Sequence, residues 1–318
     1  MKYSSAFLIL STLLINSFSF AQVREVSKYA EMVSLEKQKE ILSFLADDAL
    51  EGRASNSTGG LMTVSMAINM FKKWNMTPFY NSAYVQSFSM DSITGRNIAG
   101  VVLASGYSKD YIIVTAHYDH LGKIGGRIFN GADNNASGVT VLLTLAEIFS
   151  KLRDEAPGLK KNILFVLLDG KEHNMAGSKE FVKRLPVPSK NIVANINIDQ
   201  IGTVFAPPGK DSSYMIVLGA NKNNGFIRKR LDVANRFYGI NMNIDYSFYG
   251  SPSFADLFYK TSDQYSFARK MIPSVMVTSG IHMHTYKTTD DYQFIDYPVL
   301  AKRTQLLFYL IYQLSLIH

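Results

Sequence analysis

Short apolar segments that alternate with segments of helical spacing constrain the fold of this chain more than any other feature. Some of them, such as Asn162–Leu168 (NILFVLL), are apolar on both faces, which is typical of strands buried inside a parallel sheet. The predicted strands are Asn97–Leu103, Tyr111–Ala116, Asn162–Leu168, Ile192–Ile198, Tyr214–Leu218 and Ser274–Thr278. Helical spacing is found over 137–152, 175–184, 223–238 and 297–315. This alternation predicts an α/β fold with a mostly parallel central sheet and helices on both faces, in three layers.

The region before the first predicted strand has helical spacing instead. Apolar residues recur at helical intervals over 35–50 and 60–75, and the loop Gly52–Gly60 (GRASNSTGG) separates these two segments. No linker divides the rest of the chain. We therefore predict one domain from residue 22 to residue 318, in which about residues 22–95 form a helical cap.

The N-terminus has the composition of a secretory signal. Lys2 precedes the apolar stretch Ala6–Ile15, and Ser19-Phe20-Ala21 provides the small residues of a cleavage site. We predict that residues 1–21 are a signal peptide and that the protein is exported, to a periplasm or to the cell exterior. A buried N-terminal helix is the alternative. The sequence contains no cysteine, so disulfides are excluded and a bound metal must have nitrogen and oxygen ligands.

The distribution of charge and apolar residues argues against two further classes of function. The formal net charge is +7, but the basic residues are scattered, and the densest cluster, Arg228-Lys229-Arg230, lies in a predicted helix. A nucleic-acid surface needs basic residues gathered on one face, so we predict no nucleic-acid partner. The apolar run Thr304–Ile317 is bounded by Lys302 and Arg303 and is predicted to be a packing helix, which leaves no membrane span after the signal peptide.

Polar residues of metal-binding types follow the ends of the predicted strands or open a helix. They are His117, Asp133, Glu172 and Asp199. The carboxyl ends of the strands in an open α/β sheet form the usual ligand crevice. Histidine nitrogen and carboxylate oxygen suit Zn²⁺, and three carboxylates that meet would repel one another without a cation. We therefore predict a divalent metal site, in which Asp119 holds the second ring nitrogen of His117.

Each of these residues also has a structural interpretation that stays open. His117 alone could be a hydrogen-bonded core histidine. Asp133 could cap the helix that follows it, and Glu172 could be a solvated acid in a first helical turn. Asp199 is harder to explain in this way, because an acid that ends the apolar run NINI needs a partner or water.

Further motifs occur in a fixed order along the chain. They are LEGR at Leu50–Arg53, AHYDHLG at Ala116–Gly122, NGADNNASGV at Asn130–Val139, GSKEFV at Gly177–Val182 and SDQYSFARKMIP at Ser262–Pro273. In this order they resemble metallopeptidase family 28, which comprises the co-catalytic zinc aminopeptidases and their relatives. The resemblance covers most of the chain after residue 22 and implies the zinc-aminopeptidase fold.

The resemblance also implies a role for each candidate residue. His117 and Asp199 would bind one zinc ion, Glu172 and a late histidine would bind another, Asp133 would bridge them, and Asp119 would support a ligand. One or two zinc ions per chain are therefore expected. The usual reaction of the family removes the N-terminal amino acid of a peptide, with a glutamate beside the ligand glutamate as general base.

The sequence departs from that pattern at the base. The family usually has Glu-Glu where this chain has Lys171-Glu172, and the distance to Gly177 identifies Glu172 as the ligand. Lys171 therefore occupies the general-base position. A protonated lysine cannot take a proton from water, although burial beside metal ions could lower its pKa and make it a base.

The last metal ligand is the second departure. Counting back from Asp290 without a gap places Tyr286 where the family has a histidine. A small loop shift would bring His284 to the metal instead. Gln264 also stands where a histidine is common, at a position that is not a ligand.

Three functions are compatible with these observations. The first is an exported zinc-dependent aminopeptidase that acts on peptides, with its base and one ligand substituted. The second is a non-catalytic relative that binds peptide or metal, which Lys171 and Tyr286 suggest. The third is an acyl transferase of the glutaminyl-cyclase type, which the same fold supports with one zinc ion.

Overall fold

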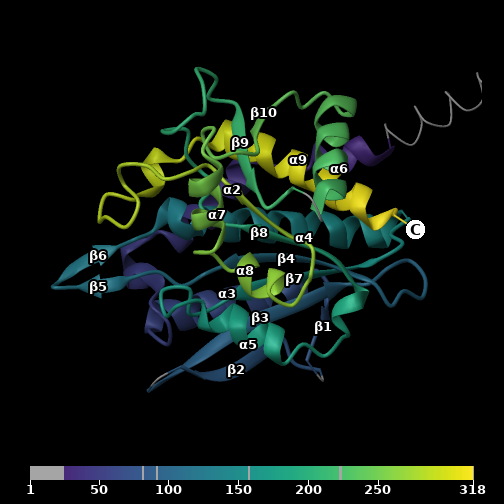
Figure 1. Cartoon of the computed structure of the whole chain (residues 1–318). Helices are drawn as coiled ribbons and strands as arrows, with labels where there is room; N and C mark the ends of the chain where they lie inside the picture. Colours follow the sequence, from purple (N-terminus) through teal and green to yellow (C-terminus); the bar gives the residue numbers. More distant parts are fainter. Residues whose placement is uncertain (1–24, 81, 91, 157, 222–223, 318) are drawn as a thin grey trace, which may run out of the picture.

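The computed structural model describes residues 25–80, 82–90, 92–156, 158–221 and 224–317 (Figure 1). The predicted signal peptide, residues 1–21, lies outside this part of the chain. No helix among the described residues has the length and apolar character needed to cross a membrane.

One large sheet organises the described residues. Its strands are β1 (Thr77–Pro78), β2 (Val85–Met90), β3 (Ile93–Val102), β4 (Tyr111–His117), β7 (Asn162–Leu168), β8 (Ile192–Ile198), β9 (Tyr214–Leu218), β10 (Asn243–Asp245) and β11 (Ser274–Thr278). The order is β1-β3-β7-β4-β8-β11-β9-β10, and β2 pairs with β3. The four central strands, β7, β4, β8 and β11, run parallel to one another, whereas β3 and β9 join them antiparallel. A separate hairpin consists of β5 (Gly122–Ile124) and β6 (Arg127–Phe129).

Helices cover both faces of this sheet (Figure 1). The first face carries α2 (Leu35–Leu45), α4 (Gly138–Glu155), α6 (Gly225–Phe237) and α9 (Tyr297–Ser315), which contact one another. The other carries α5 (Ala176–Lys183) and α8 (Gln264–Ala268). The remaining helices are α3 (Thr58–Lys73), α7 (Pro252–Tyr259) and the short turns η1 (Asp48–Arg53), η2 (Ala132–Ser137), η3 (Ser189–Asn191) and η5 (Tyr292–Phe294).

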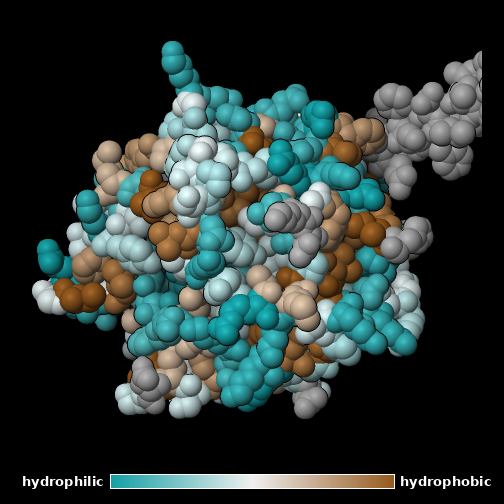
Figure 2. Space-filling model, in the orientation of Figure 1, coloured by the Kyte–Doolittle hydropathy of each residue, from teal (hydrophilic) through white to brown (hydrophobic). Residues whose placement is uncertain are grey.

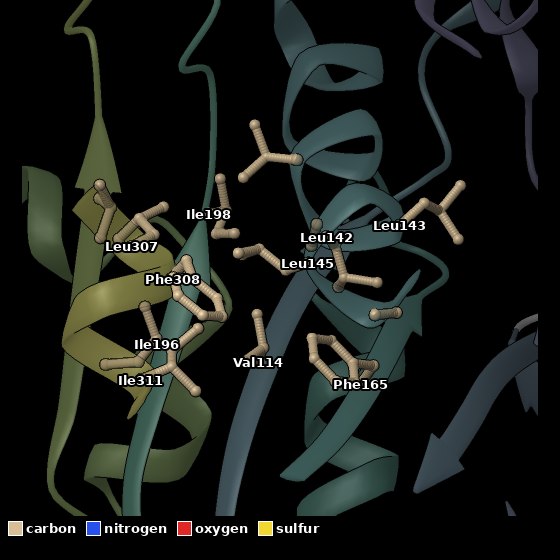
Figure 3. Packing of buried hydrophobic residues seen from close by; sticks show 14 of the residues in the cluster. Val114, Leu142, Leu143, Leu145, Phe165, Ile196, Ile198, Leu307, Phe308 and Ile311 are labelled. Atoms are coloured by element: carbon tan, nitrogen blue, oxygen red, sulfur yellow. The ribbon is translucent and has the colours of Figure 1, made fainter. Parts of the chain in front are cut away.

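Alternate residues of each central strand enter the two cores. In β4, Ile112 and Val114 pack into the larger core with α4 and α9, whereas Ile113 belongs to the smaller core beneath α5. Figure 3 shows Val114, Phe165 and Ile196 meeting Leu142 of α4 and Phe308 of α9, and all of these side chains are fully buried. Two buried faces explain why β7 has no polar face in the sequence, whereas the polar residues of β8, Asn195 and Asn197, are buried. The predicted three-layer α/β fold with a mostly parallel sheet is confirmed.

The N-terminal cap differs from the prediction in its second half. Residues up to Lys73 include the predicted helices, but residues 77–95 contribute β1, β2 and the start of β3 to the sheet. In β2, residues alternate between buried and exposed, because this edge strand packs one face only. Such a short alternation gives a weak signal in the sequence. Strand β10 has only three residues and α7 has no buried residue, so the sequence analysis missed both of them as well.

Candidate functional site

A cavity of about 450 Å³ opens beyond the carboxyl end of β8. Four segments that the sheet brings together contribute to its lining. They are Asn134, Lys171, the pair Asp199 and Gln200, and Ile281–Lys287 except His284. Helix α7 and the residues Thr261, Ser262 and Met276 complete the wall. A larger depression of about 600 Å³ between β9, α7 and α8 contains none of the predicted site residues. The cavity at β8 is therefore the candidate site, at the edge where ligands bind in open α/β sheets.

His117 and Asp199 form a buried pair at this edge. Nε2 of His117 lies 3.3 Å from Oδ1 of Asp199, and Nδ1 lies 3.0 Å from the carbonyl oxygen of Asp119. Burial lowers the pKa of His117, but the charge and hydrogen bond of Asp199 outweigh it and raise the pKa to about 9. The imidazolium donates from both nitrogens, and the hydroxyl of Ser262 donates to the other oxygen of Asp199. Neither oxygen of Asp199 is left without a donor.

Asp119 supports the site in a different way from the prediction. Its backbone carbonyl, not its carboxylate, accepts from the ring of His117. The carboxylate instead accepts the backbone N–H groups of Lys171 and Glu172, at 3.0 and 3.1 Å. Burial, with the charge of Asp169, raises the pKa of the Asp119 carboxyl to about 7. Asp119 therefore positions the loop after β7, which carries the two candidate residues.

Lys171 lies in the wall of the cavity, together with Asp199 and Tyr286. Burial lowers the pKa of Lys171, but the neighbouring acidic groups, above all Asp199, outweigh that effect and raise it above the ordinary value. The side chain therefore stays an ammonium group. In the metal-free protein it has no lone pair with which to accept a proton from water, and in this charge state it cannot act as the general base.

Glu172 faces a second histidine, which the sequence analysis did not single out. Oε1 of Glu172 lies 3.7 Å from Nδ1 of His120, and the ring of His120 stacks on Tyr286 with 6.0 Å between the ring centroids. Burial lowers the pKa of His120 to about 4, so this imidazole is neutral. His120, Glu172 and Tyr286 form one layer at the side of the cavity.

Asp133 does not belong to the lining of the cavity, and its carboxylate is held by hydrogen-bond donors of the protein. One oxygen accepts from the backbone N–H of Gly202. The other accepts from Thr203 Oγ1 and from Nε2 of His282, each at 2.9 Å. The hydroxyls of Ser137 and Ser279 lie 3.1 and 3.4 Å from the carboxylate, but each donates its hydrogen to a closer backbone carbonyl. The next residue, Asn134, lines the cavity in its place.

The late histidines are also arranged differently from the prediction. His284 stacks on Phe294, and its Nδ1 lies 2.9 Å from the hydroxyl of Thr289, so it does not join the other candidate ligands. His282 contacts Asp133, and Tyr286 faces the cavity. In the sequence, Tyr286 stands four residues before Asp290, where the family has its last histidine ligand. Tyr286 also lines the cavity.

These contacts test whether the side chains fit the zinc ions that the family resemblance implies. A carboxylate offers about four lone-pair sites, and Gly202, Thr203 and His282 donate to three of those of Asp133. Lys171 adds a positive charge where a cation would be bound. In the described part of the chain, no three His, Asp or Glu side chains are grouped so as to hold a metal ion. Although both ring nitrogens of His120 and Oε1 of Glu172 have no hydrogen-bond partner among the residues that the structure describes, Lys171 and Tyr286 at the positions of the base and the last ligand do not fit a two-zinc centre.

A buried polar network fixes the floor of the site, and the sequence analysis missed it. Thr115 of β4 and Asn197 of β8 are hydrogen-bonded at 2.8 Å, and Asn197 donates to Ser262 and Gln264. Asp263, between these two residues, is fully buried, but its carboxylate oxygens have no hydrogen-bond partner among the described residues. Polar residues inside otherwise apolar strands were the available signal, because a buried polar group must find a partner.

Known proteins share this fold. The crystal structure of the Legionella pneumophila LapA aminopeptidase superposes with a TM-score of 0.70 at 16% identity, covering 93% of this chain and 75% of that chain. Porphyromonas gingivalis glutaminyl cyclase superposes with a TM-score of 0.67 at 17% identity, covering 88% and 98%. BOS complex subunit ncln of Danio rerio is 29% identical over 154 residues, which are 48% of this chain and 24% of that protein. The match thus spans about a quarter of that relative's length. Residues 97–311 match the sequence profile of peptidase family M28, and this chain belongs to that family.

Proposed function

We propose that this protein binds peptides in the cavity beyond β8 and does not hydrolyse them. The observation that carries the proposal is the ammonium group of Lys171 in the cavity wall, beside Asp199 and Tyr286. A hydrolase of this fold needs a base and an electrophile at that place. The position predicted for the base carries a cation instead, and Asp133 has its oxygens engaged by protein donors.

Peptide remains the best ligand class for this cavity. Membership of a peptidase family supports it, and so does the composition of the wall, which combines apolar residues of α7 with polar groups at the floor. Pockets for small ligands usually have this composition and a volume in this range. The protein would therefore bind the ligand class of its family, peptides, without catalysing the hydrolysis that is usual in the family.

An exported zinc aminopeptidase that releases N-terminal residues is the second candidate. It is favoured by the family membership and by the 3.3 Å approach of His117 to Asp199, two side chains of the types that bind zinc. A glutaminyl-cyclase reaction is supported only by the fold that this chain shares with a glutaminyl cyclase. Export itself remains a prediction from residues 1–21, and the N-terminal sequence of the mature protein would test it.

A single series of assays separates the two candidates. Purified protein with added zinc is incubated with leucine-p-nitroanilide and a panel of aminoacyl substrates, and peptide binding is measured by calorimetry in parallel. We expect peptides to bind and to be recovered intact by mass spectrometry. Turnover that a chelator abolishes would overturn the proposal and establish the aminopeptidase.

A further inference from the structure

We infer that the cavity recognises the carboxyl terminus of a peptide whose last side chain is apolar. This inference rests on the proposed peptide binding and adds the end of the chain that is bound. It follows from the charges in the wall of the cavity and from the apolar residues around them.

The ammonium group of Lys171 provides donors for an anion. Lys171 lines the cavity, and within the described residues no carboxylate oxygen lies within 4.0 Å of its Nζ atom. Its backbone N–H, in contrast, is bound to Asp119 at 3.0 Å and fixes the residue in place. A lysine ammonium that is held in a recess without a close acceptor can donate to a ligand oxygen.

The other charges of the wall also favour a carboxylate over an ammonium group. Lys287 is a second lysine in the lining. Asp199 is the lining carboxylate, but its oxygens already accept from His117 and Ser262. The carboxylate of Glu172 lies to the side, next to His120. A peptide N-terminus would meet two lysines and no free carboxylate in the described lining, whereas a C-terminus would meet two cations.

The rest of the wall suits an apolar side chain. Helix α7 contributes Phe254, Leu257 and Phe258, and the loop after β11 contributes Ile281 and Met283. Leu257 is 60% exposed and Met283 is 68% exposed, so both would gain burial when a ligand binds. Figure 2 shows brown, apolar atoms beside teal, polar ones on the face that carries α7. Charge at the floor and apolar residues at the mouth together fit a terminal carboxylate with its own side chain.

The test compares three forms of one tetrapeptide, Gly-Gly-Leu-Phe, by isothermal titration calorimetry. The forms are the free peptide, the N-acetylated acid and the C-terminal amide. A charge-assisted hydrogen bond corresponds to roughly 10- to 100-fold in affinity, so the two acids should bind equally and the amide at least tenfold more weakly. Lys171→Met should remove this difference, and Lys171→Arg should retain part of it. Lys179→Met, an exposed lysine on α5, is the matched control and should bind like the wild type.

The outcomes separate this inference from the proposed function. Equal binding of acid and amide, or loss of binding on N-acetylation, overturns the inference but leaves peptide binding in place. No binding of any form overturns both. In a last titration, decanoate replaces the peptides. If decanoate binds more tightly than the two peptide acids, the cavity binds free apolar carboxylates, and this result would also overturn the inference. Thermal unfolding of each variant tests whether the variant is folded, so that a loss of peptide binding is not mistaken for a loss of structure.

Discussion

Two pairs of aspartate and histidine lie at the same edge of the sheet, and they differ in what surrounds them. In the pair of Asp133 and His282 the carboxylate is closed off from the cavity, because Gly202, Thr203 and His282 donate to it and only His282 belongs to the cavity lining. The pair of His117 and Asp199 is open on one side, because Asp199 lines the cavity. The same residue types therefore serve as a structural clamp in one place and as part of a ligand site in the other. The position of the carboxylate relative to the cavity, and not the residue type, decides the difference.

Removing the closed carboxylate should have the largest effect. Asp133→Ala leaves the N–H of Gly202 and the side chains of Thr203 and His282 without their acceptor inside the protein. Breaking a buried charged network in this way costs about 3–5 kcal/mol of unfolding free energy. Urea denaturation followed by circular dichroism measures it. Asp256→Ala, an exposed aspartate on α7, should change the free energy by less than about 0.5 kcal/mol. A loss of less than about 1 kcal/mol of unfolding free energy for Asp133→Ala would show that the contacts of this carboxylate do not stabilise the fold.

The open pair should make stability depend on pH. The pKa of His117 is about 9 in the folded protein and 6.5 as the ordinary value, so it is raised by folding. Its contribution, about 3 kcal/mol, is fully present below pH 6.5 and is lost as the pH rises through 9. The measurement is the free energy of unfolding of the wild type and of His117→Gln between pH 6 and pH 10. The difference between them should shrink with rising pH, and a constant difference would contradict a protonated pair.

Single hydroxyl groups allow a matched comparison of the two pairs. Ser262→Ala removes a donor to Asp199 and an acceptor of Asn197, whereas Thr203→Val removes one donor to Asp133. We expect each to cost about 1–2 kcal/mol in urea denaturation. Only Ser262→Ala should change peptide affinity, because Ser262 and Asp199 line the cavity, whereas Thr203 and Asp133 do not. Equal effects on affinity would remove the distinction between an open and a closed pair.

The smallest effect on stability is expected at the mouth of the cavity. Leu257 is 60% exposed, so Leu257→Ser should change the unfolding free energy by about 0.5 kcal/mol or less. Peptide affinity should nevertheless fall, because the ligand would bury this side chain. Val233→Ser on α6, 46% exposed and away from the cavity, is the control. Unchanged affinity for Leu257→Ser would place the ligand elsewhere.

The sequence predicts the centre of the fold well and its margins poorly. Strands Asn162–Leu168 and Ile192–Ile198 have the predicted limits, because burial on both faces leaves mostly apolar runs, which only Asn195 and Asn197 interrupt in the second strand. Strand β2 (Val85–Met90) packs one face only, and helix α7 has no buried residue, so neither has a strong pattern.

For the candidate site, the sequence predicts which segments meet but not how each side chain points. His117, Lys171 and Asp199 follow parallel strands, whose ends must share one edge, and they do gather there. Asp133 and Asn134 are neighbours in a loop, and only the backbone path decides which of them faces the cavity. That path depends on Asp290, whose carboxylate accepts both of their N–H groups from 156–157 residues away in the sequence.

The most direct test of the central claim is a metal analysis of the chelator-treated protein after equilibration with zinc and removal of free zinc. Lys171 and the engaged carboxylate of Asp133 predict that substantially less than one zinc ion per chain is retained, while the same sample still binds peptide. One or two tightly held zinc ions per chain would contradict the account, because the site would then carry the metal centre of a hydrolase.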